Sequence, residues 1–129
     1  MSDNELLLEV EDLHVEFRTS DGVANVLNGV GYAVHAGETL AVLGESGSGK
    51  SVTAQTVMGI LDTPPGVITG GAVRWRGEDL LTASEDRRRE VRGSEVAMIF
   101  QDALSALNPV FTVGFQIEEQ LRVRLGMSK

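Results

Sequence analysis

The chain has 129 residues, of which 42% are hydrophobic, with a net charge of −8 and no cysteine. This length suits one modest domain with one hydrophobic core, and the lack of cysteine excludes a disulfide framework and thiolate chemistry. No run approaches the ~18 consecutive apolar residues that a membrane-spanning helix needs, and the acidic start of the chain is unlike the positive start of a signal peptide.

The first third of the chain has the pattern of strands. Residues 6–17 alternate loosely between apolar and acidic side chains, which predicts one or two strand segments with a kink at Asp12. A second strand region is expected over residues 23–34, with a break at residues 28–29. The apolar run 40–43 shows no polar alternation, which is typical of a strand buried on both faces of a parallel sheet.

The middle of the chain alternates between helix and strand signals. Residues 50–61 have apolar side chains at helical spacing, and the Pro-Pro-Gly sequence at 64–66 is expected to end this helix. A strand over residues 68–75 should belong to a separate, more polar sheet. A short polar helix is expected over residues 84–92, with Ser84 as its N-cap.

The last third begins with a second fully apolar strand candidate, residues 96–100. A loop over residues 101–109 leads into an amphipathic helix over residues 113–125.

Basic residues are concentrated in one part of the chain, because six of the eleven lie between Arg74 and Arg92. Acidic residues interrupt this cluster. A nucleic-acid surface needs a basic face with little acid on it, so we interpret the cluster as a solvated helix face with internal ion pairs. We therefore expect no nucleic-acid partner.

Residues 44–51, Gly-Glu-Ser-Gly-Ser-Gly-Lys-Ser, match the phosphate-binding pattern G-x-x-x-x-G-K-[ST] in full. Glycines let consecutive backbone N–H groups point at a polyphosphate, and the following helix turns its unpaired N–H groups and positive dipole end toward it. The Lys50 ammonium would lie between the β- and γ-phosphates, and the Ser51 hydroxyl would bind Mg²⁺. The predicted nucleotide-binding residues here are Gly44, Glu45, Ser46, Gly47, Ser48, Gly49, Lys50, Ser51 and Val52.

Two other interpretations of this segment are weaker. A glycine-rich turn could merely link a strand to a helix, but a strand, a loop and a helix all agree with the phosphate-binding pattern. A dinucleotide-binding loop would need a third glycine where Val52 stands.

Three short segments add to the phosphate-binding loop: Val42-Leu43 before it, and Met-Ile-Phe-Gln-Asp at 98–102 and Leu-Asn-Pro at 107–109 after it. Together they closely resemble ATP-binding-cassette (ABC) transporter ATPases, within them the dipeptide, oligopeptide and nickel import group. The resemblance covers essentially the whole chain. It implies an α/β fold in which residues 1–129 form the N-terminal part of a nucleotide-binding domain. An antiparallel β-subdomain, about residues 5–35 with 68–76, would flank a partial P-loop NTPase core.

The resemblance also implies two site residues outside the loop. Gln101 stands where the family has its Q-loop glutamine, whose amide oxygen can bind Mg²⁺ or the attacking water; Ser51 and Gln101 are thus the expected metal ligands. Phe17 stands where the family has an aromatic residue that stacks on adenine, although an aromatic residue at the end of a strand can also be part of the core. Ala103 departs from the family pattern, which usually has proline there.

Several catalytic parts of the family are not found in the 129 residues. These are the Leu-Ser-Gly-Gly-Gln signature, the second acidic motif with its catalytic glutamate, and the switch histidine. We therefore expect a fragment that holds nucleotide without activating water, and its activity as an enzyme stays open. One hypothesis is the first half of an ATPase subunit that powers import. The alternative is a non-catalytic nucleotide-binding or transporter-docking module.

The resemblance implies a set of partners. These are ATP with Mg²⁺, transmembrane permease subunits and a second ABC ATPase subunit, with the protein peripheral at the cytoplasmic face of the membrane. The segment 102–119 would form part of the groove that receives a short helix of the membrane subunit, because it combines apolar anchors with an acidic rim.

Overall fold

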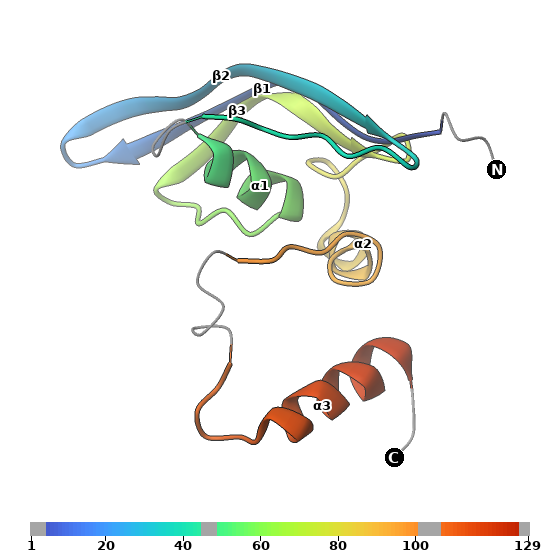
Figure 1. The fold of residues 1–129 in the computed structure, drawn as a ribbon. Helices are drawn as coiled ribbons and strands as arrows, with labels where there is room; N and C mark the ends of the chain where they lie inside the picture. Colours follow the sequence, from blue (N-terminus) through green and yellow to red (C-terminus); the bar gives the residue numbers. More distant parts are fainter. Residues whose placement is uncertain (1–4, 45–48, 101–106, 127–129) are drawn as a thin grey trace. The chain divides into compact units, whose positions relative to one another are not determined.

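The computed structural model describes residues 5–44, 49–100 and 107–126. The chain divides into two compact units, residues 1–88 and residues 89–129. Each unit is described by itself below, and Figure 1 shows the elements of both.

The first unit is built on one antiparallel sheet of four strands. The strands are β1 (Leu6–Thr19), β2 (Gly22–His35), β3 (Gly66–Trp75) and β4 (Glu78–Asp79), in the order β2-β1-β3-β4. β1 and β2 form a hairpin, and β3 returns along the other edge of β1. This arrangement confirms the predicted antiparallel subdomain of residues 5–35 with 68–76.

The predicted kink at Asp12 is confirmed, and it is a bulge in β1. The pairing register shifts between Val10 and Leu13 on the β2 edge and between Glu11 and His14 on the β3 edge, and Asp12 has a φ of 46°. The neighbouring strands carry glycines with positive φ beside the bulge: Gly29 in β2 (85°) and Gly71 in β3 (98°). A side chain at Gly71 would collide with the backbone of Asp12 and Leu13. β2 continues through the expected break as one strand.

α1 (Lys50–Met58) lies along one face of this sheet (Figure 1). It turns Val57 and two threonines inward. The buried hydroxyls of Thr53 and Thr56 each donate at 2.8 Å to the carbonyl four residues earlier, so neither is left without an acceptor. The buried apolar core of the unit consists of Val10, Leu13, Val15, Leu27, Val57, Ala72, Val73 and Leu80.

The predicted end of this helix is wrong by several residues. α1 ends at Gly59, which adopts the left-handed conformation with a φ of 72° and donates its N–H to the carbonyls of Gln55 and Thr56. The Pro-Pro-Gly sequence at 64–66 lies beyond this cap. A glycine in the left-handed conformation satisfies the last carbonyls of a helix, so it ends the helix before the prolines can.

Charged side chains tie the outer parts of the first unit together. The guanidinium of Arg74 in β3 bonds the carboxylates of Glu11 and Glu9 in β1, and these hydrogen bonds raise the pKa of Arg74. Arg87 reaches Glu78 of β4 with a 2.8 Å bond from Nε. The arginine cluster is thus paired with acids, as predicted for a solvated face.

α2 (Glu85–Val91) begins where predicted, because the Ser84 hydroxyl accepts a 3.1 Å hydrogen bond from the Arg87 N–H. The second unit contains α3 (Val113–Leu125), whose first turn is capped by the Thr112 hydroxyl. Both predicted helices are therefore confirmed.

The two fully apolar strands predicted from the sequence are absent from the described part of the chain. Residues 40–43 form no strand, and the 96–100 segment makes one isolated bridge, from Val96 to Arg92. Leu43 is 92% exposed and Ile99 is 95% exposed. A strand buried on both faces needs neighbours that supply hydrogen bonds along its length, and no described strand pairs with either segment.

Candidate phosphate-binding site

The amino-terminal end of α1 has the donors that a phosphate needs. Its N-cap, Gly49, is left-handed with a φ of 94° and provides no side-chain acceptor to the first turn. The Thr53 N–H bonds the Gly49 carbonyl at 2.9 Å, so the N–H groups of Lys50, Ser51 and Val52 precede the first helical hydrogen bond. The first turn contains no acidic residue that would compete for them. This end of the helix therefore favours an anion.

Lys50 links the two ends of the phosphate-binding loop. Its ammonium donates a hydrogen bond to the Gly44 carbonyl, and its side chain is exposed. Ser51 is also exposed at the start of the helix. A cation, free helix-end donors and an accessible hydroxyl are the groups that bind a phosphate with its magnesium ion.

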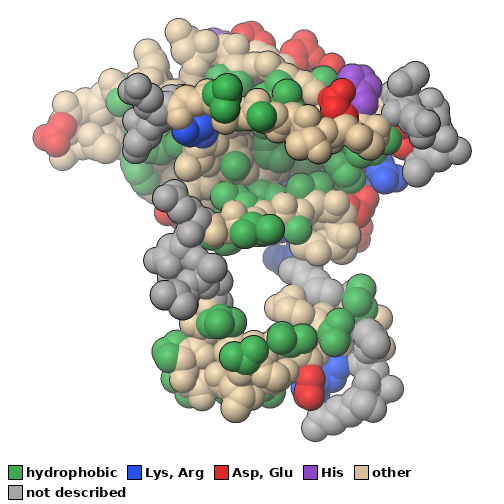
Figure 2. Space-filling view, viewed as in Figure 1, with side chains coloured by type: hydrophobic (Ala, Val, Ile, Leu, Met, Phe, Trp, Pro, Cys, Tyr) green, Lys and Arg blue, Asp and Glu red, His purple; other side chains and the backbone are tan. Residues whose placement is uncertain are grey.

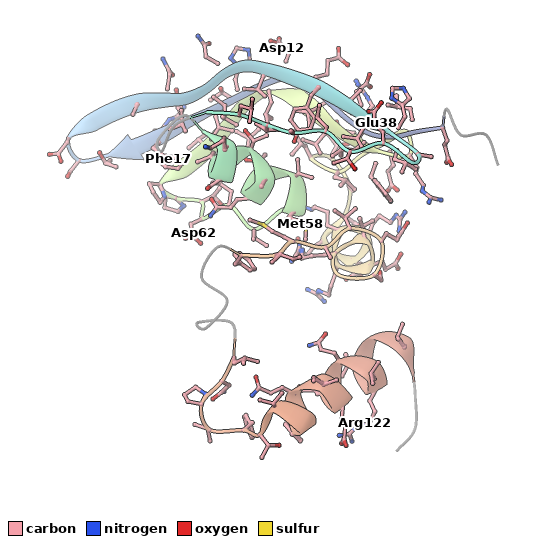
Figure 3. All side chains as sticks on the ribbon, in the orientation of Figure 1. Asp12, Phe17, Glu38, Met58, Asp62 and Arg122 are labelled. Atoms are coloured by element: carbon pink, nitrogen blue, oxygen red, sulfur yellow. The ribbon has the colours of Figure 1, made fainter. Side chains whose placement is uncertain are left out.

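Phe17 lies near the end of β1 and is half-buried. Its partners on the two neighbouring strands, Ala24 and Gly66, are both small. Figure 3 shows Phe17 on the side of the sheet where α1 lies. A side chain at Gly66 would meet Leu61, so the space on that edge of β1 is filled, and stacking of Phe17 on a planar base stays a prediction.

Five predicted site residues lie outside the described residues. They are Glu45, Ser46, Gly47, Ser48 and Gln101. Their roles stay predictions.

One contact of this site was not anticipated from the sequence. Gly49 is buried against β2, where the nearest side chain is that of Leu27. No local pattern marks Leu27 as part of a nucleotide site, because the contact joins residues 22 positions apart.

The second unit carries a separate feature, a turn over residues 108–112 held by Gln116. The Gln116 Oε1 accepts from the Asn108 N–H at 3.0 Å, and Nε2 donates to the carbonyls of Asn108 and Phe111 at 3.1 Å each. Asn108 in turn accepts the Val110 N–H at 2.9 Å through its own side chain. The Leu-Asn-Pro segment is therefore bound to α3 by side-chain hydrogen bonds.

The turn presents apolar side chains to solvent. Val110 is 81% exposed, Phe111 is 50% exposed, and the rings of Phe111 and Phe115 stack at 5.0 Å between centroids. Hydrophobic side chains are visible on the surface of this unit in Figure 2. The expected docking role of this segment stays a prediction. None of the helices in the described residues combines the length and the hydrophobicity of a membrane-spanning segment.

Comparison with known proteins agrees with the geometry. The ABC transporter family model matches residues 27–127. The oligopeptide transport ATP-binding protein of Bacillus subtilis (strain 168) is 48% identical over 115 residues, which cover 89% of this chain and 32% of the relative.

Two further relatives are similar. The dipeptide transport ATP-binding protein of the same strain is 43% identical over 125 residues, or 97% of this chain and 37% of that protein. A Brucella abortus (strain 2308) protein named for peptide import is 49% identical over 121 residues, or 94% of this chain and 36% of that protein. The chain spans about a third of the length of these curated relatives.

Proposed function

The chain belongs to the ABC transporter family, and from this premise we propose that it binds ATP with Mg²⁺ as part of an importer's ATP-binding subunit. The proposed cargo is peptides or related small solutes, in line with the transport and import functions in the names of its relatives. The observation that carries the proposal is the start of α1, where the first-turn N–H groups occur together with Lys50 and Ser51.

The predicted site residues have different parts in the proposed binding of nucleotide. Lys50 exchanges the Gly44 carbonyl for phosphate oxygens, and the first-turn N–H groups of α1 donate to the same phosphates. Phe17 stacks on the adenine ring. The Ser51 hydroxyl and the Gln101 amide oxygen would hold Mg²⁺, which would supply positive charge beside the phosphates.

We propose ATP hydrolysis only for a whole ATP-binding subunit. The 129 residues contain neither the Leu-Ser-Gly-Gly-Gln signature nor the acidic motif with its catalytic glutamate. Because phosphoryl transfer depends on groups that position water and stabilise charge, we expect this chain alone to release no phosphate steadily. The second candidate function is a nucleotide-binding or docking module without turnover.

The proposed partners follow from membership of a transporter family. Transmembrane permease subunits and a second ATPase subunit complete the importer, with this protein peripheral at the cytoplasmic face of the membrane. The exposed side chains of Val110 and Phe111 support docking of an apolar helix of the permease on the 108–112 turn.

The test of nucleotide binding is isothermal titration of the chain with Mg-ATP. Lys50→Ala removes a charge-assisted contact of roughly 1.5–3 kcal/mol, so we expect it to weaken binding by roughly 10- to 150-fold. Arg122→Ala is the matched control, because it removes an exposed cation from α3 whose ion pair with Glu118 is long, at 4.0 Å. Equal affinities of wild type and Lys50→Ala would contradict the proposal.

A further inference from the structure

The start of α1 is held against the sheet through one side chain of β2. A methyl group placed on Gly49 would lie 2.7 Å from Leu27 Cδ2 and 3.2 Å from the carbonyl oxygen of Val26. Leu27 itself is 3% exposed, so it has little freedom to move aside. Gly49 is thus needed for its contact with β2 as well as for its φ of 94°.

The same leucine lies beside the strand segment that carries Phe17. Leu27 pairs with Val15 of β1, and Glu16 pairs with Asn25, so the extra residue of this bulge lies in β2. Side chains of β1 therefore continue to alternate between the two faces of the sheet here, so Val15 and Phe17 share one face. That face is the one on which α1 lies (Figure 3).

We propose that Leu27 is a positioning residue that sets the separation between the phosphate-binding end of α1 and the base-binding ring of Phe17. The inference rests on the proposed binding of ATP. Leu27 acts through Gly49 on one side and through Val15 of β1 on the other, so it needs no contact with the nucleotide.

If Leu27 has this role, replacing it should weaken only ligands that contact two anchors, the start of α1 and the ring of Phe17. None of the proposed phosphate-binding groups belongs to β1, so a bare polyphosphate binds without contact with this strand. ATP has to satisfy the phosphate-binding groups and the ring of Phe17 at once. A change in the spacing between α1 and the sheet should therefore weaken the binding of ATP and leave the binding of the polyphosphate unchanged.

The experiment compares Leu27→Val with Leu13→Val. Both residues are buried core leucines, and Leu27, unlike Leu13, has the side chain that lies nearest to Gly49. Each variant is titrated with Mg-ATP and with magnesium tripolyphosphate. We expect Leu27→Val to lower the affinity for ATP about three- to tenfold, which is within the range of coupling between contacting residues. The affinity for tripolyphosphate should change less than about twofold. Leu13→Val is expected to change neither affinity.

Two further variants sharpen the comparison. Leu27→Met keeps a long side chain of similar volume, so we expect it to retain the affinity for ATP. If Leu27→Val does not fold, Leu27→Ile preserves the volume while moving a methyl group away from Cδ2, and the same selective loss is expected. In a Phe17→Ala background, the loss caused by Leu27→Val should disappear, because one of the two anchors is gone.

The outcomes separate this inference from the proposed function. A wild-type chain that binds neither ATP nor tripolyphosphate contradicts the proposed function. A wild-type chain that binds both, with Leu27→Val equal to Leu13→Val, overturns the role of Leu27 alone. The role of Leu27 is also contradicted if Leu27→Val lowers the affinities for ATP and tripolyphosphate by the same factor, because that result indicates damage to the phosphate-binding loop itself.

Discussion

Gln116 shows how one side chain can give a loop a defined conformation. Its amide has both an acceptor and two donors, and all are used on the backbone of the turn that precedes α3. Asn108 completes the turn by accepting the N–H of Val110. The two exposed apolar side chains of the turn, Val110 and Phe111, are thereby held in place without being buried.

Replacing Gln116 with alanine should therefore loosen the turn and leave the helix in place. The Asn108 N–H loses its acceptor, and we expect its hydrogen exchange to accelerate about 5- to 10-fold, as for the loss of one ordinary hydrogen bond. Exchange measured by NMR checks this. Gln120→Ala, an exposed glutamine of the same helix, is the control. Unchanged exchange at Asn108 in Gln116→Ala would contradict the assigned contacts.

At the scale of elements, caps decide where the helices begin and end. Ser84 and Thr112 accept hydrogen bonds from N–H groups three residues later, and both helices begin there. Gly59 ends α1 through its left-handed conformation, well before the prolines. The prolines are the more obvious signal in the sequence. Gly59 is the effective one because its conformation satisfies carbonyls that the helix would otherwise leave unpaired.

Alanine substitutions at two glycines should have opposite effects on their helices. At Gly59, alanine is forced into a left-handed conformation, which costs about 1–2 kcal/mol and should destabilise α1. At Gly114, inside α3, the position of a new methyl group is open, so alanine should stabilise α3 by about 0.5–1 kcal/mol. Hydrogen exchange within each helix measures both changes. A stabilising Gly59→Ala would contradict the role of Gly59 as the cap.

At the scale of the whole molecule, two apolar segments, 40–43 and 96–100, pair with none of the strands in the described residues. Leu43 and Ile99 are almost fully exposed, in segments that the sequence pattern marks as buried strands. Exposed apolar backbone that can still form strands is a template for pairing with another chain. The apolar segments around Leu43 and Ile99 are therefore the parts of the chain most prone to association.

We expect the isolated chain to associate as its concentration rises. A Leu43→Lys/Ile99→Lys double variant should reduce this association, because charges on an unpaired strand oppose pairing. Multi-angle light scattering gives the mass at each concentration. Val110→Lys, which changes another highly exposed apolar residue outside the two segments, is the control. A wild-type chain that stays monomeric at high concentration would contradict the prediction.

In an assembled importer, the 108–112 turn should matter for transport more than for nucleotide binding. We expect Phe111→Asp to lower substrate uptake on the order of tenfold, as for a central residue of an interface, with Mg-ATP affinity unchanged. Val123→Asp, on the exposed surface of α3 away from the turn, is the comparison. Normal uptake in Phe111→Asp, or joint loss of uptake and nucleotide binding, would defeat the docking proposal.

The sequence by itself determined the features that depend on neighbouring residues. The phosphate-binding pattern occupies eight consecutive positions, the kink at Asp12 and the cap Ser84 act within a few residues, and the β1–β2 hairpin joins adjacent strands. Such features follow from local backbone preferences and short-range hydrogen bonds.

Only the tertiary structure decided the features that join distant segments. The contact between Leu27 and Gly49 depends on how α1 packs on the sheet, and no periodicity in the sequence encodes that distance. The apolar segments 40–43 and 96–100 have the composition of buried strands, yet they form none in the described chain. The physical reason is that a strand exists only as a pair, because its backbone hydrogen bonds are completed by a neighbour that its own sequence does not contain.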